Sequence, residues 1–167
     1  MPEEFVILFS EKKCIQCHGC ETACKSWRGV ELGVKWRRVD NLWSGRYPRV
    51  KSTSLSLSCM HCVDPACVRA CPTGAIEKRP DSGVVIVDRD GCNGCQSCLD
   101  ACPFHVPQFG TDGMMQKCDL CCDETDLAAG GPPCVVMCPT KALQYGKIDS
   151  QLKTIVERSL KELLEAR

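Results

Sequence analysis

The sequence is poor in the large apolar residues that normally build a hydrophobic core. It contains only 4 Phe, 3 Trp and 2 Tyr among 167 residues. Its apolar fraction of 44% includes 17 cysteines, and without them only about a third of the chain is apolar. A chain of this length with so few apolar side chains needs another source of stability.

The chain also lacks an excess of either charge and lacks a long apolar run. Its 21 basic and 21 acidic residues cancel, which argues against a nucleic-acid binder and against an acidic disordered chain. No apolar run approaches the roughly eighteen residues of a transmembrane helix. The N-terminus is acidic at Glu3 and Glu4, whereas a secretory signal begins with basic residues. These absences predict a soluble chain that is made in the reducing cytoplasm.

Cysteine is the residue in excess, at 17 of 167 positions. Because disulfides are rare in the cytoplasm, so many cysteines are better explained as metal ligands. Sixteen of them form four groups of four. Group one is Cys14, Cys17, Cys20 and Cys24, and group two is Cys59, Cys62, Cys67 and Cys71. Group three is Cys92, Cys95, Cys98 and Cys102, and group four is Cys118, Cys121, Cys134 and Cys138. Cys122 is left over, because Cys121 keeps the C-x2-C spacing of group four.

The spacing within the groups indicates iron–sulfur clusters. Groups one and three read C-x2-C-x2-C-x3-C, and groups two, three and four end in Cys-Pro. This is the pattern that binds a [4Fe–4S] cluster in bacterial ferredoxins. Three closely spaced thiolates hold one cluster, and in two-cluster ferredoxins the fourth cysteine ligates the other cluster. Pro72, Pro103 and Pro139 then direct the exit of the chain, because proline restricts the residue before it.

Two other interpretations of the cysteines fit less well. A disulfide framework needs an oxidising compartment and gives no reason for triplet spacing. Zinc ribbons use two C-x2-C pairs around one tetrahedral ion. That arrangement is a poor match to triplets followed by C-x3-C-P, so the sequence favours clusters over zinc.

The segments between the groups predict short strands and short helices. Residues 5–9 and 84–87 are apolar and predict strands, the second after the turn signal Asp81-Ser82-Gly83. Short helices are expected over 19–27 and 96–101. The segments 71–76 and 138–143 parallel each other, which indicates an internal repeat. The predicted fold class is therefore α+β, with the alternation of elements expected of ferredoxin modules.

Several segments carry a resemblance that goes beyond the cysteines. They are GVKWRRV at 33–39, CVDPACV at 62–68, GCNGC at 91–95 and KCDLC at 117–121. With them, residues 4–146 resemble the four-cluster iron–sulfur (beta) subunit of the dimethyl sulfoxide reductase family of molybdopterin and tungstopterin oxidoreductases. The resemblance implies an electron-transfer subunit that serves a catalytic molybdenum or tungsten pterin subunit. Since all sixteen ligand positions hold cysteine, four [4Fe–4S] clusters are expected rather than a three-iron variant.

The resemblance also implies how the groups pair. Group one pairs with group four, and group two pairs with group three. The implied ligand sets are Cys14, Cys17, Cys20 and Cys138; Cys118, Cys121, Cys134 and Cys24; Cys59, Cys62, Cys67 and Cys102; and Cys92, Cys95, Cys98 and Cys71. Two interleaved two-cluster ferredoxin modules follow. The outer module comprises residues 1–49 and 106–147, the inner module comprises 50–105, and residues 148–167 form a C-terminal amphipathic helix.

Three features outside the cysteine groups have two interpretations each. The C-terminal helix either packs on its own domain or docks a partner, with Lys153, Glu157 and Lys161 expected on its polar side. Residues 36–38 either face a partner or pack over a cluster. His61, which lies between two cysteines of group two, is expected next to the cluster ligands or on the surface rather than as a ligand or proton carrier. It is also the best candidate for tuning a cluster.

No catalytic role is expected for the chain itself, because it has no dinucleotide fingerprint, P-loop or nucleophile elbow. The favoured function is an electron-transfer subunit of anaerobic respiration, bound to a catalytic pterin subunit, with or without a further redox or membrane-anchor subunit. The alternative is a free polyferredoxin that serves hydrogenase or formate hydrogenlyase machinery. The cytoplasm is the expected compartment, and export in the folded state with a signal-bearing catalytic subunit is the alternative.

Overall fold

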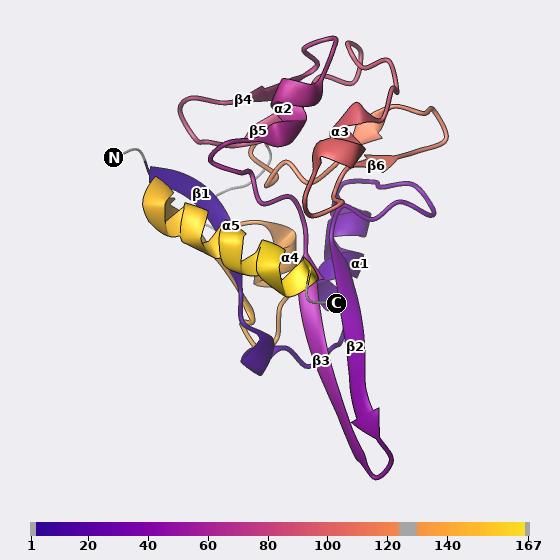
Figure 1. Ribbon diagram of the computed structural model, residues 1–167, viewed down its shortest axis with the longest axis vertical. Helices are drawn as coiled ribbons and strands as arrows, with labels where there is room; N and C mark the ends of the chain where they lie inside the picture. The colour runs from indigo at the N-terminus through magenta and orange to yellow at the C-terminus, as the bar shows by residue number, and fades with distance from the viewer. Residues whose placement is uncertain (1–2, 124–129, 166–167) are drawn as a thin grey trace.

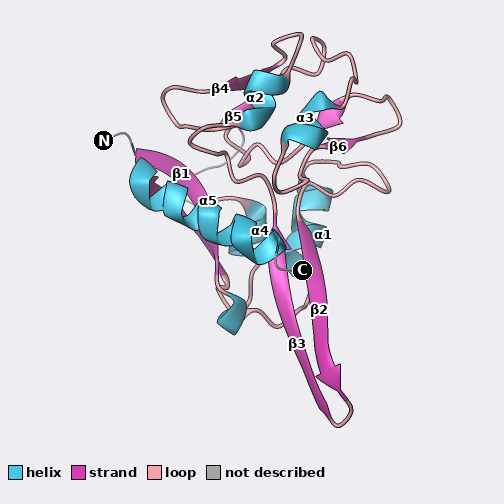
Figure 2. Cartoon of the chain, viewed as in Figure 1, coloured by secondary structure: helices cyan, strands magenta, loops and turns pink. Residues whose placement is uncertain are grey.

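The computed structural model describes residues 3–123 and 130–165, which form short elements joined by long loops (Figures 1 and 2). The helices are α1 (Gly19–Trp27), α2 (Ala66–Ala70), α3 (Ser97–Ala101), α4 (Pro133–Val136) and α5 (Ser150–Glu165), with a 3-10 turn η1 (Glu11–Lys13). The mixed α/β class with small elements and a C-terminal helix is confirmed. The expected strands 5–9 and 84–87 correspond to β1 (Glu3–Phe9) and β5 (Val85–Val87), and the expected helices 19–27 and 96–101 correspond to α1 and α3.

The strands form four separate antiparallel ribbons of two strands each within the described residues. They are β1 (Glu3–Phe9) with β8 (Leu143–Asp149), β2 (Arg38–Arg46) with β3 (Arg49–Leu57), β4 (Ile76–Lys78) with β5 (Val85–Val87), and β6 (Gln108–Phe109) with β7 (Met115–Gln116). The pairing of β1 with β8 joins segments from opposite ends of the chain. The outer part of the β2–β3 ribbon, toward its turn, projects from the rest of the molecule (Figure 1).

The helices contact each other in two pairs. Helix α1 packs against α4, and α2 packs against α3. Within α1, Cys20 and Cys24 lie four residues apart and are both buried, because side chains at this spacing share one face of a helix. Helix α4 begins with Pro133 at its first position. Proline is tolerated there because an N–H at this position would have no acceptor within the helix. Segments of the two chain ends therefore meet around one helix pair, and segments of the middle meet around the other.

The buried core is divided into small clusters that contain or touch cysteines. One consists of Cys20, Cys24, Val39, Cys134 and Leu143, and another of Ile76, Val85, Cys98 and Met115. The other two are built on Leu55 with Leu57, Phe104 and Val106, and on Val84 with Cys118 and Leu120. None of the helices in the described part of the chain combines the length and apolar content that crossing a bilayer requires.

Helix α5 packs on its own chain, through Leu160 and Leu164 against the cluster of Leu55 and Phe104. The expectation that Lys153 lies on the polar side was wrong, because this side chain is 0% exposed. Its Nζ donates to Oε2 of Glu4 at 2.7 Å, and Lys78 Nζ donates to Oε1 of the same carboxylate at 2.6 Å. The ion pair with the Glu4 carboxylate on β1 therefore holds the Lys153 side of α5 against the protein interior.

We expect Glu4→Gln to lower the free energy of unfolding by about 3–5 kcal/mol, because breaking a buried ion pair leaves an uncompensated charge. Denaturant titration of the cluster-loaded protein under anaerobic conditions measures the change. Lys161→Gln is the matched control: its pair with Glu165 is exposed, and such pairs are worth about 0–1 kcal/mol. Equal effects of the two substitutions would show that the Glu4 pair contributes no more than a surface pair.

The Glu4 pair also predicts a pH dependence. Burial raises the pKa of the Glu4 carboxyl, but the hydrogen bonds and charges of Lys153 and Lys78 outweigh it and hold the pKa below 4.5. A carboxyl with a lowered pKa in the folded state contributes stability above its unfolded pKa, and this contribution is lost as the pH falls through the lowered value. The difference in stability between wild type and Glu4→Gln should therefore shrink below about pH 4.5.

Candidate functional site

Cysteines of groups one and four surround one small pocket. Its lining includes four thiols that come from a loop, from α1 and from the segment after α4. They are Cys14, Cys17, Cys20 and Cys138. The aliphatic and aromatic side chains of Phe9, Val39 and Leu143 complete the wall. One of the four predicted ligand sets is therefore brought together from positions more than a hundred residues apart.

A second set of thiols from the same two groups lies deeper in the molecule. It consists of Cys24, Cys118, Cys121 and Cys134, all of which are buried. Burial raises the pKa of Cys24 to about 11, and the charge of Cys134 acts in the same direction. Burial likewise raises the pKa of Cys121 to about 12, with Asp119, Cys134 and Cys24 among the negative groups that contribute. Burial also raises the pKa of Cys118, and the charges of Cys134 and Cys24 act in the same direction. The members of this set therefore lie near one another.

Groups two and three provide the other two sets. The pKa of Cys62 is raised mainly by burial. The Glu157 carboxylate is the next cause, and the thiols of Cys59, Cys102 and Cys67 add to it. Burial also raises the pKa of Cys98 to about 11, together with the thiols of three neighbours. Those neighbours are Cys92, Cys95 and Cys71. Each thiol therefore has as neighbours the three other members of its predicted ligand set.

Each cysteine group contains a residue in the left-handed backbone region. A residue with positive φ lies between the cysteines of every group: Gln16 (60°) in group one, His61 (50°) in group two, Gly94 (69°) in group three and Leu120 (58°) in group four. Alternation of right- and left-handed residues points successive backbone N–H groups into one concavity, which attracts anions and occurs at iron–sulfur sites. The loops are shaped for a negatively charged group.

Backbone amides and hydroxyls also point at the thiols of the repeated Cys-Pro-Thr segments. Ala142 N donates to Sγ of Cys138 at 3.2 Å, and Thr73 Oγ1 lies 3.5 Å from Sγ of Cys71. Burial acts to raise the pKa of both thiols, but these hydrogen bonds and those of further amides together outweigh it and leave the pKa below 9.0. Thiolates at these positions are stabilised before any metal is considered.

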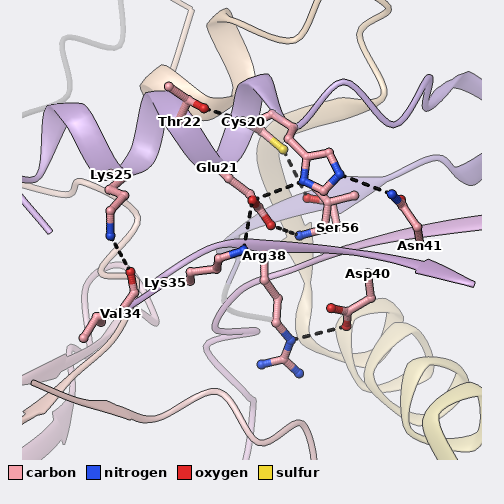
Figure 3. Close-up of polar contacts among 12 residues, drawn as sticks. Cys20, Glu21, Thr22, Lys25, Val34, Lys35, Arg38, Asp40, Asn41 and Ser56 are labelled. Carbon is pink, nitrogen blue, oxygen red and sulfur yellow. Dashed lines mark hydrogen bonds and ion pairs between the residues drawn. The ribbon is translucent and has the colours of Figure 1, made fainter. Parts of the chain in front are cut away.

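A polar network anchors α1 to the β2–β3 ribbon (Figure 3). The Glu21 carboxylate accepts hydrogen bonds from Val39 N and from Lys35 Nζ, and His18 Nδ1 lies 3.2 Å from it. Burial opposes the charge, but these contacts hold the pKa of Glu21 below 4.5. The network fixes the helix that carries Cys20 and Cys24.

The sequence predicts that residues 36–38 either face a partner or pack over a cluster. Arg37 is only 2% exposed, so it does not face a partner. Trp36 packs against the cysteine-containing clusters and donates through Nε1 to Gln116 Oε1 at 2.9 Å. His61 is also inside, at 1% exposure, which rules out a surface role. Its Nδ1 accepts a hydrogen bond from Val85 N at 2.9 Å, so the neutral ring carries its hydrogen on Nε2.

The donor set fits iron–sulfur clusters. Within residues 3–123 and 130–165, no three His, Cys, Asp or Glu side chains are arranged to hold a single metal ion. A tetrahedral zinc ion needs its ligands close together, whereas a cubane spreads four thiolates over four irons. Two buried N–H groups, Arg37 Nε and His61 Nε2, have no acceptor among the described residues. A sulfur-rich anion would supply acceptors of the kind that such donors require.

Comparisons with known proteins agree with this chemistry. Residues 50–148 match the family model described as 4Fe-4S dicluster domain. The chain is 40% identical over 163 residues to the B subunit of anaerobic dimethyl sulfoxide reductase from Escherichia coli, an alignment that covers 92% of this chain and 78% of that protein. It is 42% identical over 173 residues to the formate dehydrogenase iron-sulfur subunit of Wolinella succinogenes, covering 90% and 85%.

A third relative is the thiosulfate reductase electron transfer subunit PhsB of Salmonella typhi, 41% identical over 157 residues that cover 89% of this chain and 79% of that protein. The chain belongs to the iron–sulfur subunits of molybdoenzymes. As a member of that family it is a non-catalytic electron-transfer subunit that carries four [4Fe–4S] clusters. The resemblance that the sequence carries is confirmed at this level.

Proposed function

We propose that each cluster is held by three cysteines of one group and one cysteine of the paired group. Clusters A and B belong to the outer module and clusters C and D to the inner one. Cluster A takes Cys14, Cys17, Cys20 and Cys138, and cluster B takes Cys118, Cys121, Cys134 and Cys24. Cluster C takes Cys59, Cys62, Cys67 and Cys102, and cluster D takes Cys92, Cys95, Cys98 and Cys71. The proposal is supported by one observation: the thiols of each set are neighbours in the fold.

These sets divide the chain into two interleaved modules. Residues 1–49 and 106–147 form the outer module, residues 50–105 the inner module, and residues 148–167 the C-terminal helix. The pairing of β1 with β8 and of α1 with α4 supports the outer module. The pairing of β4 with β5 and of α2 with α3 supports the inner module. Exchange of the fourth cysteine within each module follows two-cluster ferredoxins.

The clusters, when bound, accept and release single electrons. The chain holds them at fixed positions, excludes water from them and sets their potentials through burial and hydrogen bonds. Cys122 is outside all four sets, and its thiol accepts a hydrogen bond from Arg79 at 3.5 Å. It is the spare cysteine in this proposal.

The partner in this proposal is a catalytic molybdenum or tungsten pterin subunit, with or without a further redox or membrane-anchor subunit. Support comes from the relatives, which are named as parts of dimethyl sulfoxide reductase, formate dehydrogenase and thiosulfate reductase. The competing proposal, a free polyferredoxin, has no such support. The substrate is that of the catalytic subunit and is not encoded in this chain.

Anaerobic purification of the tagged chain from its native cells tests the partner. We expect a larger subunit that contains a pterin-bound molybdenum or tungsten to copurify in a fixed ratio. Addition of the substrate of that subunit should change the electron paramagnetic resonance (EPR) signals of the clusters. A chain that elutes as a cluster-loaded monomer under the same conditions would instead support the free carrier.

A further inference from the structure

Arg37 is a fully charged side chain in the interior without a carboxylate partner among the described residues. It directly precedes β2 and is 2% exposed. Its Nη1 donates to Ser56 Oγ at 3.0 Å, and its Nη2 donates to Ser58 Oγ at 2.8 Å. Its Nε has no acceptor within residues 3–123 and 130–165. Neutral hydroxyls cannot balance a guanidinium, and an unpaired buried charge is strongly destabilising.

Since no carboxylate pairs with Arg37 among the described residues, its charge has to be balanced by other negative groups. Burial works against its positive charge, but the thiols of Cys134, Cys118, Cys20 and Cys24 outweigh burial, so the pKa of Arg37 lies above its ordinary value. Cys20 belongs to the proposed set of cluster A. The other three belong to cluster B. Arg37 also lines one pocket together with Cys24, so it lies beside members of both ligand sets of the outer module.

Ser56 links Arg37 directly to a thiol. A guanidinium can only donate, so Ser56 Oγ must accept from Arg37. The hydroxyl hydrogen of Ser56 is then available for Cys20 Sγ, which lies 3.6 Å away (Figure 3). The order of donors is fixed from guanidinium to hydroxyl to sulfur. A hydrogen bond to a cluster thiolate is one of the features that set the potential of a cluster.

We propose that Arg37 is the shared counter-charge of clusters A and B and raises the reduction potentials of both, with Ser56 relaying its effect to cluster A. This proposal rests on the ligand sets proposed above. A fixed positive charge favours the reduced state of a cluster, because reduction adds a negative charge. Clusters C and D should be affected much less, because the thiols that act most strongly on Arg37 all belong to the outer module.

The test is an EPR-monitored redox titration of the anaerobically purified complex. In Arg37→Gln, two of the four midpoint potentials should fall by about 59 mV or more, which corresponds to a tenfold shift of a one-electron equilibrium. Arg37→Lys should show a smaller shift, because lysine keeps the positive charge but cannot make the two hydrogen bonds of the guanidinium to Ser56 and Ser58 in the same way. Arg49→Gln, which removes an exposed arginine near the tip of the β2–β3 ribbon, should leave all four potentials unchanged.

Ser56→Ala keeps the test decisive if Arg37→Gln fails to assemble. It should lower one potential, that of cluster A, while the iron content stays at the wild-type value. Unchanged potentials in both Arg37→Gln and Ser56→Ala would overturn the proposal, as would an equal shift of all four clusters. Failure of the ligand sets is distinguishable, because it alters the iron content of cysteine variants and leaves the Arg37 titration informative.

Discussion

Anaerobic removal of iron by a chelator is expected to unfold most of this chain. The buried clusters of side chains are small, and cysteines are part of nearly all of them. Structural zinc contributes about 10–16 kcal/mol to small domains that fold around it, and four cubanes have a comparable role here. We therefore expect far-UV circular dichroism to lose most of its helical and strand signal and proteolysis to accelerate more than tenfold.

The buried thiols are the physical reason why we expect the metal-free fold to be lost. Burial raises the pKa of Cys24, Cys67 and Cys98 to about 11. Without metal these thiols are protonated at neutral pH, and Cys24 then no longer helps to balance the buried charge of Arg37. Removal of excess iron from a sample whose clusters remain intact is the control. A chelated, cluster-free chain that keeps its circular dichroism spectrum and its resistance to protease would contradict this explanation.

Substitution of two cysteines from one proposed set should cost no more clusters than substitution of one. Cys14→Ser and Cys138→Ser each remove a ligand of cluster A, so each single variant and the double variant should lose one cluster, about four irons. Cys14→Ser combined with Cys24→Ser should lose two clusters, although both residues belong to group one. Iron content and EPR signals of anaerobic preparations measure these losses.

Cys122→Ser is the matched control for this series, because Cys122 neighbours group four and lies outside every proposed set. It should retain the full iron content. If Cys14→Ser with Cys24→Ser loses a single cluster while Cys14→Ser with Cys138→Ser loses two, each group binds its own cluster. That pattern would overturn both the exchange of the fourth cysteine and the interleaved modules.

The sequence predicted those parts of the fold that local pattern determines. Apolar runs and cysteine spacing located β1 and α1 because both signals lie within a few neighbouring residues. The β2–β3 ribbon was missed as a pair, since its strands are rich in polar residues such as Asn41, Ser52 and Ser54 and most of its outer part is exposed. Ribbons of that kind carry little apolar alternation for a sequence pattern to reveal.

The burial of charged residues could not be predicted from sequence. Helical spacing placed Lys153 with the polar residues of α5, but its position is decided by the carboxylate of Glu4, 149 residues away. Arg37 is inside, where it donates to Ser56 and Ser58 and feels the negative charges of thiols from two cysteine groups. In both cases the deciding partner is remote in sequence, and a charged residue is normally assigned to the surface when its partner is unknown.

The most direct test of the central claim is the content of iron and acid-labile sulfide per chain. It is measured on the anaerobically purified protein. Four cubanes on this chain predict about sixteen irons and sixteen sulfides per polypeptide. Values near eight, or a preparation in which zinc is the main metal, would contradict the four-cluster electron-transfer subunit described here.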